Sequence, residues 1–96
     1  MRRKNEENMR VVINRLLKAY GLDEGYYNTL VINAWPKVMG SMIAKKTIDL
    51  HIKKQVLYVK LNSAPLKQEL NSGKSKVVQL LNEYAGKEVI REVIFQ

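Results

Sequence analysis

Apolar side chains recur at helical spacing near the start of the chain. Over residues 5–20 they fall three and four positions apart, with Arg10, Asn14 and Lys18 between them and Gly21 following: Met9, Val12, Ile13, Leu16, Leu17 and Tyr20. This period predicts an amphipathic helix that ends at the glycine. Such a helix normally buries its apolar face against the rest of the protein.

A second apolar stripe follows Asp23, a residue type that is typical of a helix N-cap: Tyr27, Val31, Ala34, Trp35 and Val38. A residue before proline avoids helical geometry, so we expect a break or kink at Trp35, ahead of Pro36. Gly40 then closes the last turn, and residues 41–44 form a short turn of their own. On this stripe Trp35 is expected to be a core anchor.

Strict alternation over the next residues indicates two strands. The inward positions are Ile48, Leu50 and Ile52, then Leu57, Val59 and Leu61, whereas the outward ones are Asp49, His51 and Lys53, then Tyr58 and Lys60. This pattern predicts an antiparallel hairpin with one buried face that turns near 53–55. The turn lacks the Asn-Gly or Asp-Gly pair that tight loops favour, which leaves its register open.

The remaining residues predict two helices and a last strand. Ser63-Ala64-Pro65 is typical of a helix start, Asn71-Ser72-Gly73 interrupts it, and Val77–Tyr84 continue as a further helix to Gly86. Residues 89–95 are rich in β-branched side chains. The order α-α-β-β-α-α-β indicates an α+β fold, in which helices cover one face of a small three-stranded sheet. We expect a single domain over 1–96, with residues 1–4 flexible.

Positive charge is the most pronounced feature of the composition. The 96 residues hold 17 Lys and Arg against nine Asp and Glu, for a net charge of +8. Such a charge attracts polyanions, namely nucleic acid, an anionic membrane surface or an acidic protein. The excess is concentrated in 1–22, with six cations against two acids, and in 45–60, with five lysines against one acid. Solubility alone is the alternative explanation for so basic a chain.

Ten residues are candidates for contacts with nucleic acid. They lie around the hairpin, at the start of the last helix and at the N-terminal tip: Lys45, Lys46, Lys53, Lys54 and Lys60; Gly73, Lys74 and Lys76; Arg2 and Arg3. Free N–H groups at a helix start favour a phosphate. Tyr58 and Tyr26 are the aromatic residues that could stack on bases. We expect the lysines to converge on one positive surface, the alternative being that they solvate turns and a strand edge.

Catalysis is not indicated. His51 is the sole histidine, and it can touch Asp49 on the outward face of the strand, but nothing nearby suggests a nucleophile or a water-excluding pocket. The chain has no cysteine and no glycine-rich nucleotide loop, so we expect no enzyme, metal or cofactor. No apolar run approaches the length of a membrane-spanning helix, and the lack of cysteine suits the cytoplasm.

A set of ordered motifs resembles the DciA-like family. Trp35-Pro36-Lys37-Val38-Met39-Gly40, followed by Ile43-Ala44, is similar to its W-x-x-V-x-G-x-x-(I/L)-A opening. The similarity continues through later segments and covers about residues 9–96: Val56–Ser63, Gln68-Glu69-Leu70, Leu80-Leu81-Asn82 and Val93-Ile94-Phe95. Each piece is short, and it is their order that makes the resemblance specific.

This resemblance implies a K-homology-like fold, α-β-β-α-α-β after an extra N-terminal helix. It also implies DNA binding that supports loading of the bacterial replicative helicase. K-homology domains clamp the nucleic-acid backbone with a Gly-x-x-Gly loop between adjacent helices. The equivalent place here, residues 71–74, holds one glycine, Gly73, beside Lys74.

Two further functions remain open from the sequence. One is a protein-interaction adaptor whose basic face meets an acidic partner. The other is an RNA-binding protein of K-homology-like shape. A membrane-surface role is disfavoured, because the cations lie on predicted strands and turns rather than along one basic amphipathic helix.

Overall fold

The computed structural model describes the backbone of residues 2–96 and the side chains of residues 9 and 11–96. The elements are, in chain order, α1 (Arg2–Ala19), α2 (Asp23–Met39), α3 (Ser41–Lys45), β1 (Thr47–Lys53), β2 (Val56–Leu61), α4 (Ala64–Asn71), α5 (Lys74–Ala85) and β3 (Glu92–Phe95). The predicted α+β class and the three-stranded sheet are confirmed. The central strand β2 pairs antiparallel with β1 and parallel with β3.

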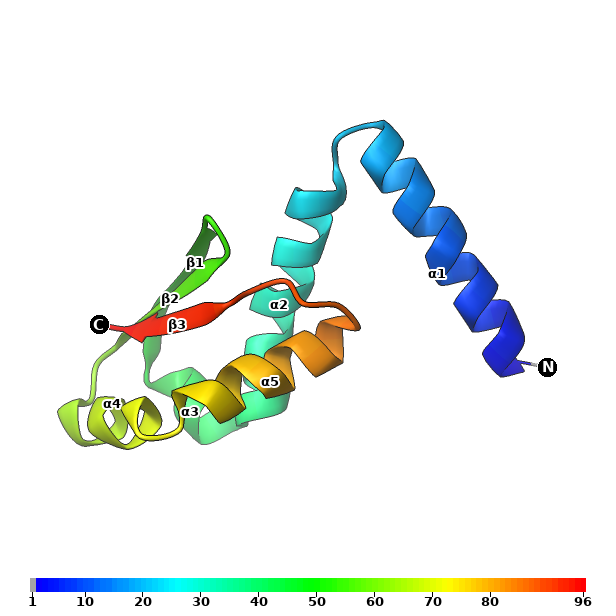
Figure 1. Ribbon diagram of the computed structural model, residues 1–96. Coiled ribbons are helices and arrows are strands. Elements are labelled where there is room, and N and C mark those ends of the chain that lie inside the picture. Colours follow the sequence, from blue (N-terminus) through cyan, green and yellow to red (C-terminus); the bar gives the residue numbers. More distant parts are fainter. Residues whose placement is uncertain (1) are drawn as a thin grey trace.

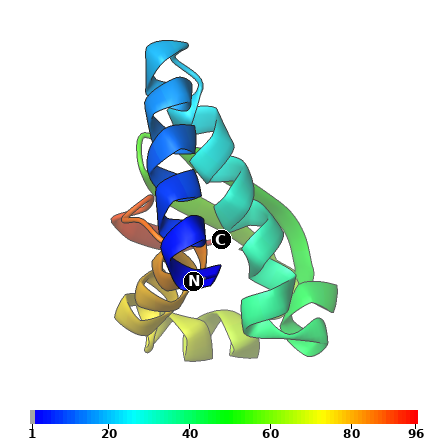
Figure 2. The same ribbon diagram turned by 90° about the vertical axis from the view of Figure 1, so that its right-hand side faces the viewer.

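The elements form layers (Figures 1 and 2). Helices α2 and α5 pack against one face of the sheet, and α1 lies beyond them on the side away from the strands. The other face of the sheet, called here the open face, has no described helix across it. Its outward residues are correspondingly exposed or half-buried: Asp49, His51, Lys53, Tyr58, Lys60 and Ile94. The molecule is elongated, 44 × 29 × 20 Å, because α1 extends away from the core.

Trp35 lies at the centre of the core, as predicted, with 1% of its surface exposed. Its indole N–H donates to the Thr47 hydroxyl at 2.9 Å, and that hydroxyl donates to the Ile43 carbonyl at 2.8 Å. The Phe95 ring lies 6.3 Å from it, centroid to centroid. One side chain thereby connects α2, α3, β1 and β3.

Helix α2 differs from the sequence prediction at both ends. It continues through Pro36 to Met39, where the Gly40 N–H donates to the Pro36 carbonyl at 3.0 Å. Of the two expected alternatives, a break or a kink at Trp35, the break is wrong, because the unbroken helix keeps Trp35 on the same buried stripe as Val31. At the other end Leu22 occupies the N-cap position and makes no side-chain bond. Asp23 is therefore in the first turn, where its charge still suits the helix dipole.

A β-bulge exposes one hairpin residue that the sequence pattern predicted to face inward. The register passes from Thr47 opposite Leu61 to Asp49 opposite Lys60, which leaves Ile48 as the extra residue. An extra residue disrupts the alternation of faces at that point. Ile48 is accordingly 57% exposed, contrary to its predicted inward position, whereas the later residues of β1 keep the predicted alternation.

The last strand is shorter than predicted and begins at Glu92 rather than Val89. The residues before it form a loop that the Asn82 side chain holds in place. Its Oδ1 accepts from the Val89 and Ile90 N–H groups at 2.9 and 3.1 Å, and its Nδ2 donates to the Ile90 carbonyl at 2.8 Å. Because these backbone groups bond to a side chain, they are not available to a strand ladder.

The two later helices follow the prediction closely. The Ser63 hydroxyl caps α4 by accepting from the Leu66 N–H at 3.3 Å, with Pro65 in the first turn. Gly86 ends α5 at φ 78°, a left-handed conformation that glycine adopts without strain. Ser72 and Gly73 form the turn between the helices.

The first helix is confirmed, but its apolar stripe is not buried. It begins at Arg2 rather than at residue 5, so residues 2–4, expected to be flexible, are helical, and Met1 lies outside the described residues. On the stripe Leu16 is 53% and Tyr20 is 75% exposed. The Tyr27 hydroxyl donates to the Asn14 side chain and joins α1 to α2. Within residues 2–96, no helix has both the length and the hydropathy needed to cross a membrane.

We expect Thr47→Val to destabilise the fold by about 1–3 kcal/mol, because it leaves the buried Trp35 N–H without an acceptor. Thr47→Ser keeps the hydroxyl and serves as the control, with a smaller loss. Urea denaturation followed by the fluorescence of Trp35, the sole tryptophan, measures both. Equal unfolding midpoints for the valine and serine variants would contradict the proposed role of this hydrogen bond.

Candidate nucleic-acid interface

The hairpin ends in a tight turn of unusual composition. Lys53 pairs with Val56, so only Lys54 and Gln55 lie between the strands, which settles the open register. Both turn residues have positive φ, 51° and 65°. Two-residue hairpin loops of this kind normally contain Asn and Gly, because other side chains are strained there. A lysine and a glutamine are thus held in a costly backbone conformation at the tip of the sheet.

The start of β3 connects this turn to the N-terminus of α5. The Arg91 N–H donates to the Gln55 carbonyl at 2.9 Å. Arg91 also lines a hollow of about 380 Å³ together with Lys74, the first residue of α5, and with Ser75, Val78, Glu92 and Val93. We call Lys53, Lys54, Lys74 and Arg91 the tip cluster. Two of its cations, Lys74 and Arg91, line the hollow together with one carboxylate, that of Glu92.

The N-terminus of α5 adds backbone donors to the tip cluster. Gly73 is the N-cap residue, at φ −121°, and no side chain caps the helix. The N–H groups of the first helical turn have no partner within the helix. A Cβ on Gly73 would meet nothing within 4 Å, so the backbone here is open to approach. Lys76 is exposed one turn into the same helix and does not line the hollow.

The candidate lysines of the hairpin form two groups. Lys45 and Lys46 precede β1, whereas Lys53 is its last residue and Lys54 lies in the turn, so the six extended residues 47–52 separate the two pairs by about 20 Å. Lys60 lies on the open face opposite Asp49, near the Lys46 end. The hairpin therefore carries two groups of cations, one at each end. Arg2 and Arg3 lie in the first turn of α1, and their side chains are outside the described residues.

The two aromatic candidates occupy different surfaces. Tyr58 lies on the open face, where its ring stacks on His51 with centroids 4.9 Å apart and planes at 12°. Tyr26 lies on α2, where it packs edge-on against Tyr27 at 5.0 Å and lines a hollow beside α1. Of the two, only Tyr58 shares a face with candidate lysines.

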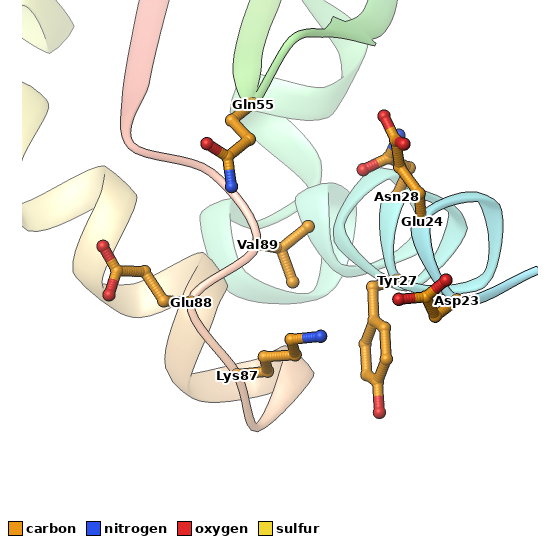
Figure 3. Close-up of a pocket in the computed structure, with 8 residues that line it drawn as sticks. All are labelled: Asp23, Glu24, Tyr27, Asn28, Gln55, Lys87, Glu88 and Val89. Atoms are coloured by element: carbon orange, nitrogen blue, oxygen red, sulfur yellow. The ribbon is translucent and has the colours of Figure 1, made fainter. Parts of the chain in front are cut away.

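The hollow drawn in Figure 3 has the wrong charge for a polyanion. It measures about 280 Å³ and is lined by Asp23, Glu24, Glu88 and Lys87, together with Tyr27, Asn28, Gln55 and Val89. The Lys87 ammonium lies 4.5 Å from the centre of the Tyr27 ring, which holds it by a cation–π contact. Three carboxylates against one cation disfavour a phosphate at this position.

The polar pair on β1 has no catalytic surroundings. His51 Nδ1 lies 3.1 Å from Asp49 Oδ2, and 53% and 60% of these two side chains are exposed. The contact anticipated from the sequence is therefore present, on a solvated face. Among the described residues, no group of three or more acidic or histidine side chains is placed to hold a metal ion.

Sequence reasoning missed Arg91. It is a single cation between Ile90 and Glu92, and no motif surrounds it. Its position depends on the parallel register that sets Glu92 beside Val56. That pairing joins segments 36 residues apart, which a local pattern does not specify. The sequence offered no separate signal for Arg91, because the strand predicted over 89–95 includes this position.

Comparison with known proteins identifies one family. Residues 8–95 match the family described as Dna[CI] antecedent, DciA. The matched range includes nearly all of the motifs on which the resemblance rests. A search of curated proteins found no match.

We expect Gln55→Gly to stabilise the protein by about 0.5–1 kcal/mol. Glycine removes about 1–2 kcal/mol of left-handed backbone strain from the folded state. Its greater conformational entropy in the unfolded chain offsets part of that gain. Thermal unfolding monitored by circular dichroism measures the change, with Gln55→Ala as the control that keeps the strain. A lower melting temperature for Gln55→Gly than for Gln55→Ala would contradict the strained geometry of the turn.

Proposed function

We propose that this chain, which belongs to the DciA family, is a non-enzymatic nucleic-acid-binding module that acts in support of replicative helicase loading. The family is linked to helicase loading by its name. The observation that carries the proposal is the tip cluster, in which Arg91 is bonded through its backbone to the hairpin turn and shares a hollow with Lys74 at the uncapped start of α5. DNA is favoured over RNA because of the family.

The charges of the tip cluster are available to a ligand. Among the described side chains, none of its four cations takes part in an ion pair, and three of the four are exposed. Exposed and unpaired cations can neutralise phosphates and release their counterions, which favours association with a polyanion. The first-turn N–H groups of α5 would add hydrogen bonds to the same phosphate oxygens.

The chemistry of the cluster favours contacts to the backbone of the nucleic acid. Three of its four cations are lysines, which attract phosphates as point charges without the fixed fork that reads a base edge. The Ser72-Gly73 turn corresponds to the place where K-homology domains clamp the backbone. We therefore expect binding that depends strongly on salt and weakly on sequence.

Charge reversal at the two ends of the hairpin tests this interface. We expect the double variant Lys53→Glu, Lys54→Glu to weaken DNA binding by tenfold or more, because it removes phosphate contacts and adds repulsion. The slope of log K against log salt concentration should decrease in magnitude by about 0.7–0.9 per lost contact. Fluorescence anisotropy with a labelled oligonucleotide at several salt concentrations measures both quantities.

The matched control is Lys45→Glu, Lys46→Glu, which changes the charge equally at the other end of β1. We expect its affinity to change less and its salt slope to stay near that of the unsubstituted protein. An equal loss for both variants would show that only net charge matters. Undiminished binding by the Lys53→Glu, Lys54→Glu variant would refute the tip cluster as the interface.

A second proposed function rests on the unburied apolar stripe of α1. Val12, Leu16 and Tyr20 are exposed on α1, and only part of this helix packs against the rest of the protein. Arg15 and Lys18 lie beside this stripe and are exposed as well. A partner that covers it needs an apolar groove with acidic neighbours. We propose that the replicative helicase supplies this groove.

We expect Val12→Gln, Leu16→Gln to weaken helicase binding by tenfold or more and to leave the fold intact, because glutamine is a good helix former and both sites are exposed. Isothermal titration calorimetry with the replicative helicase of the same organism measures the affinity. Met42→Gln is the control, since Met42 is an exposed apolar residue on α3. Concentration-dependent dimers that the double substitution abolishes would instead assign the stripe to a second copy of the chain.

A further inference from the structure

We propose that the open face of the sheet binds unpaired bases by stacking on His51, so that the ligand is single-stranded nucleic acid. This inference rests on the proposed function and adds the class of nucleic acid to it. The tip cluster accounts for attraction to any phosphate backbone. It does not distinguish a single strand from a duplex, whereas an aromatic platform does.

Three side chains in one row build the platform. The register places His51 on β1 opposite Tyr58 on β2, and Tyr58 beside Ile94 on β3. The imidazole and phenol rings are stacked, with centroids 4.9 Å apart and planes at 12°. Exposure increases along the row, from half-buried Ile94 and Tyr58 to exposed His51. Because β1 is an edge strand, the free face of the stack is that of the imidazole.

The orientation of the imidazole ring is fixed before any ligand binds. The Tyr58 ring stacks on one face of the imidazole, and the imidazole Nδ1 contacts Asp49 Oδ2 at 3.1 Å. An aromatic side chain that is already held in place loses little conformational entropy when a base stacks on it. A base would then stack on the outer face of the His51 imidazole, whose other face stacks on Tyr58.

Lysines flank the platform along both strands. Lys53 lies two residues beyond His51 and Lys60 two residues beyond Tyr58, each about 7 Å further along its strand and on the same face. Both are exposed, and they lie on opposite sides of the row, because β1 and β2 are antiparallel. Of the acidic residues on this face, Asp49 contacts His51 and Glu92 lies on β3, the strand farthest from His51. A strand that crosses His51 would therefore meet a lysine on each side.

The platform is continuous with the tip cluster because Lys53 belongs to both. Phosphates bound at the turn would lead one strand directly onto the open face. The flat faces of paired bases are already stacked within a duplex, so a duplex would use the tip cluster alone. The structure thus predicts two contact modes that respond to different substitutions.

Affinity for three matched ligands tests the proposal: a labelled single-stranded DNA, the duplex of the same sequence and a single-stranded RNA. We expect His51→Ala to weaken binding of both single strands by about tenfold to a hundredfold, the usual effect of removing one stacking side chain. Its affinity for the duplex should be unchanged. His51→Phe retains an aromatic face and should restore most of the loss. The Lys53→Glu, Lys54→Glu variant should weaken all three.

A fluorescent reporter gives an independent measurement. Trp35 is the sole tryptophan and is buried, so its emission should not respond to nucleic acid. In His51→Trp, a base that stacks at position 51 should quench the new emission on addition of single strands and not of duplex. The emission maximum of Trp35 in His51→Ala confirms that the fold is retained.

The outcomes separate the two proposals. If the unsubstituted protein binds none of the three ligands, the proposed function and this inference both fail. If it binds them and His51→Ala has the same affinity for single strands, or loses affinity for single strands and duplex equally, only the stacking platform is refuted. Unquenched emission from His51→Trp in the presence of bound single strand would refute it as well.

Discussion

The buried indole of Trp35, with its N–H bonded to Thr47, is the contact on which the rest of the structure depends. An indole of this size can be buried only if its polar edge finds an acceptor. The Thr47 hydroxyl accepts from this N–H and donates its own hydrogen bond to the Ile43 carbonyl, which ties α3 to the first residue of β1. The helical stripe continues through Pro36 because Trp35 has to face this core.

That arrangement leaves two unburied surfaces on opposite sides of the molecule, one polar and one apolar. The sheet presents its open face and the tip cluster, while α1 presents an apolar stripe beyond the helices (Figure 1). A ligand on the sheet would therefore not block a partner on α1. The strained turn at Lys54 and Gln55 fits this view, because strain concentrates at functional positions and is sustained by the surrounding fold.

The resemblance and the periodicity predicted different parts of the molecule well. Local signals located the helices that begin at Ser63 and end at Gly86, since caps and glycine stops act within a few residues. They were less successful where a side chain overrode the local preference. The Asn82 side chain accepts hydrogen bonds from the backbone of Val89 and Ile90, so these residues do not join the last strand. The bulge turns Ile48 outward. Neither effect has a signature in the neighbouring residues.

The sequence by itself determined the element order, the amphipathic character of each element, the burial of Trp35 and the excess of positive charge. These features depend on residue type and on spacing within one element. Only the tertiary structure decided which cations become neighbours. Arg91 lies beside the hairpin turn because β3 pairs parallel with β2, and it shares a hollow with Lys74, while Lys45 and Lys46 are separated from the turn by the length of β1. Coulomb attraction depends on distance in space, and the strand register that sets this distance comes from packing the whole core.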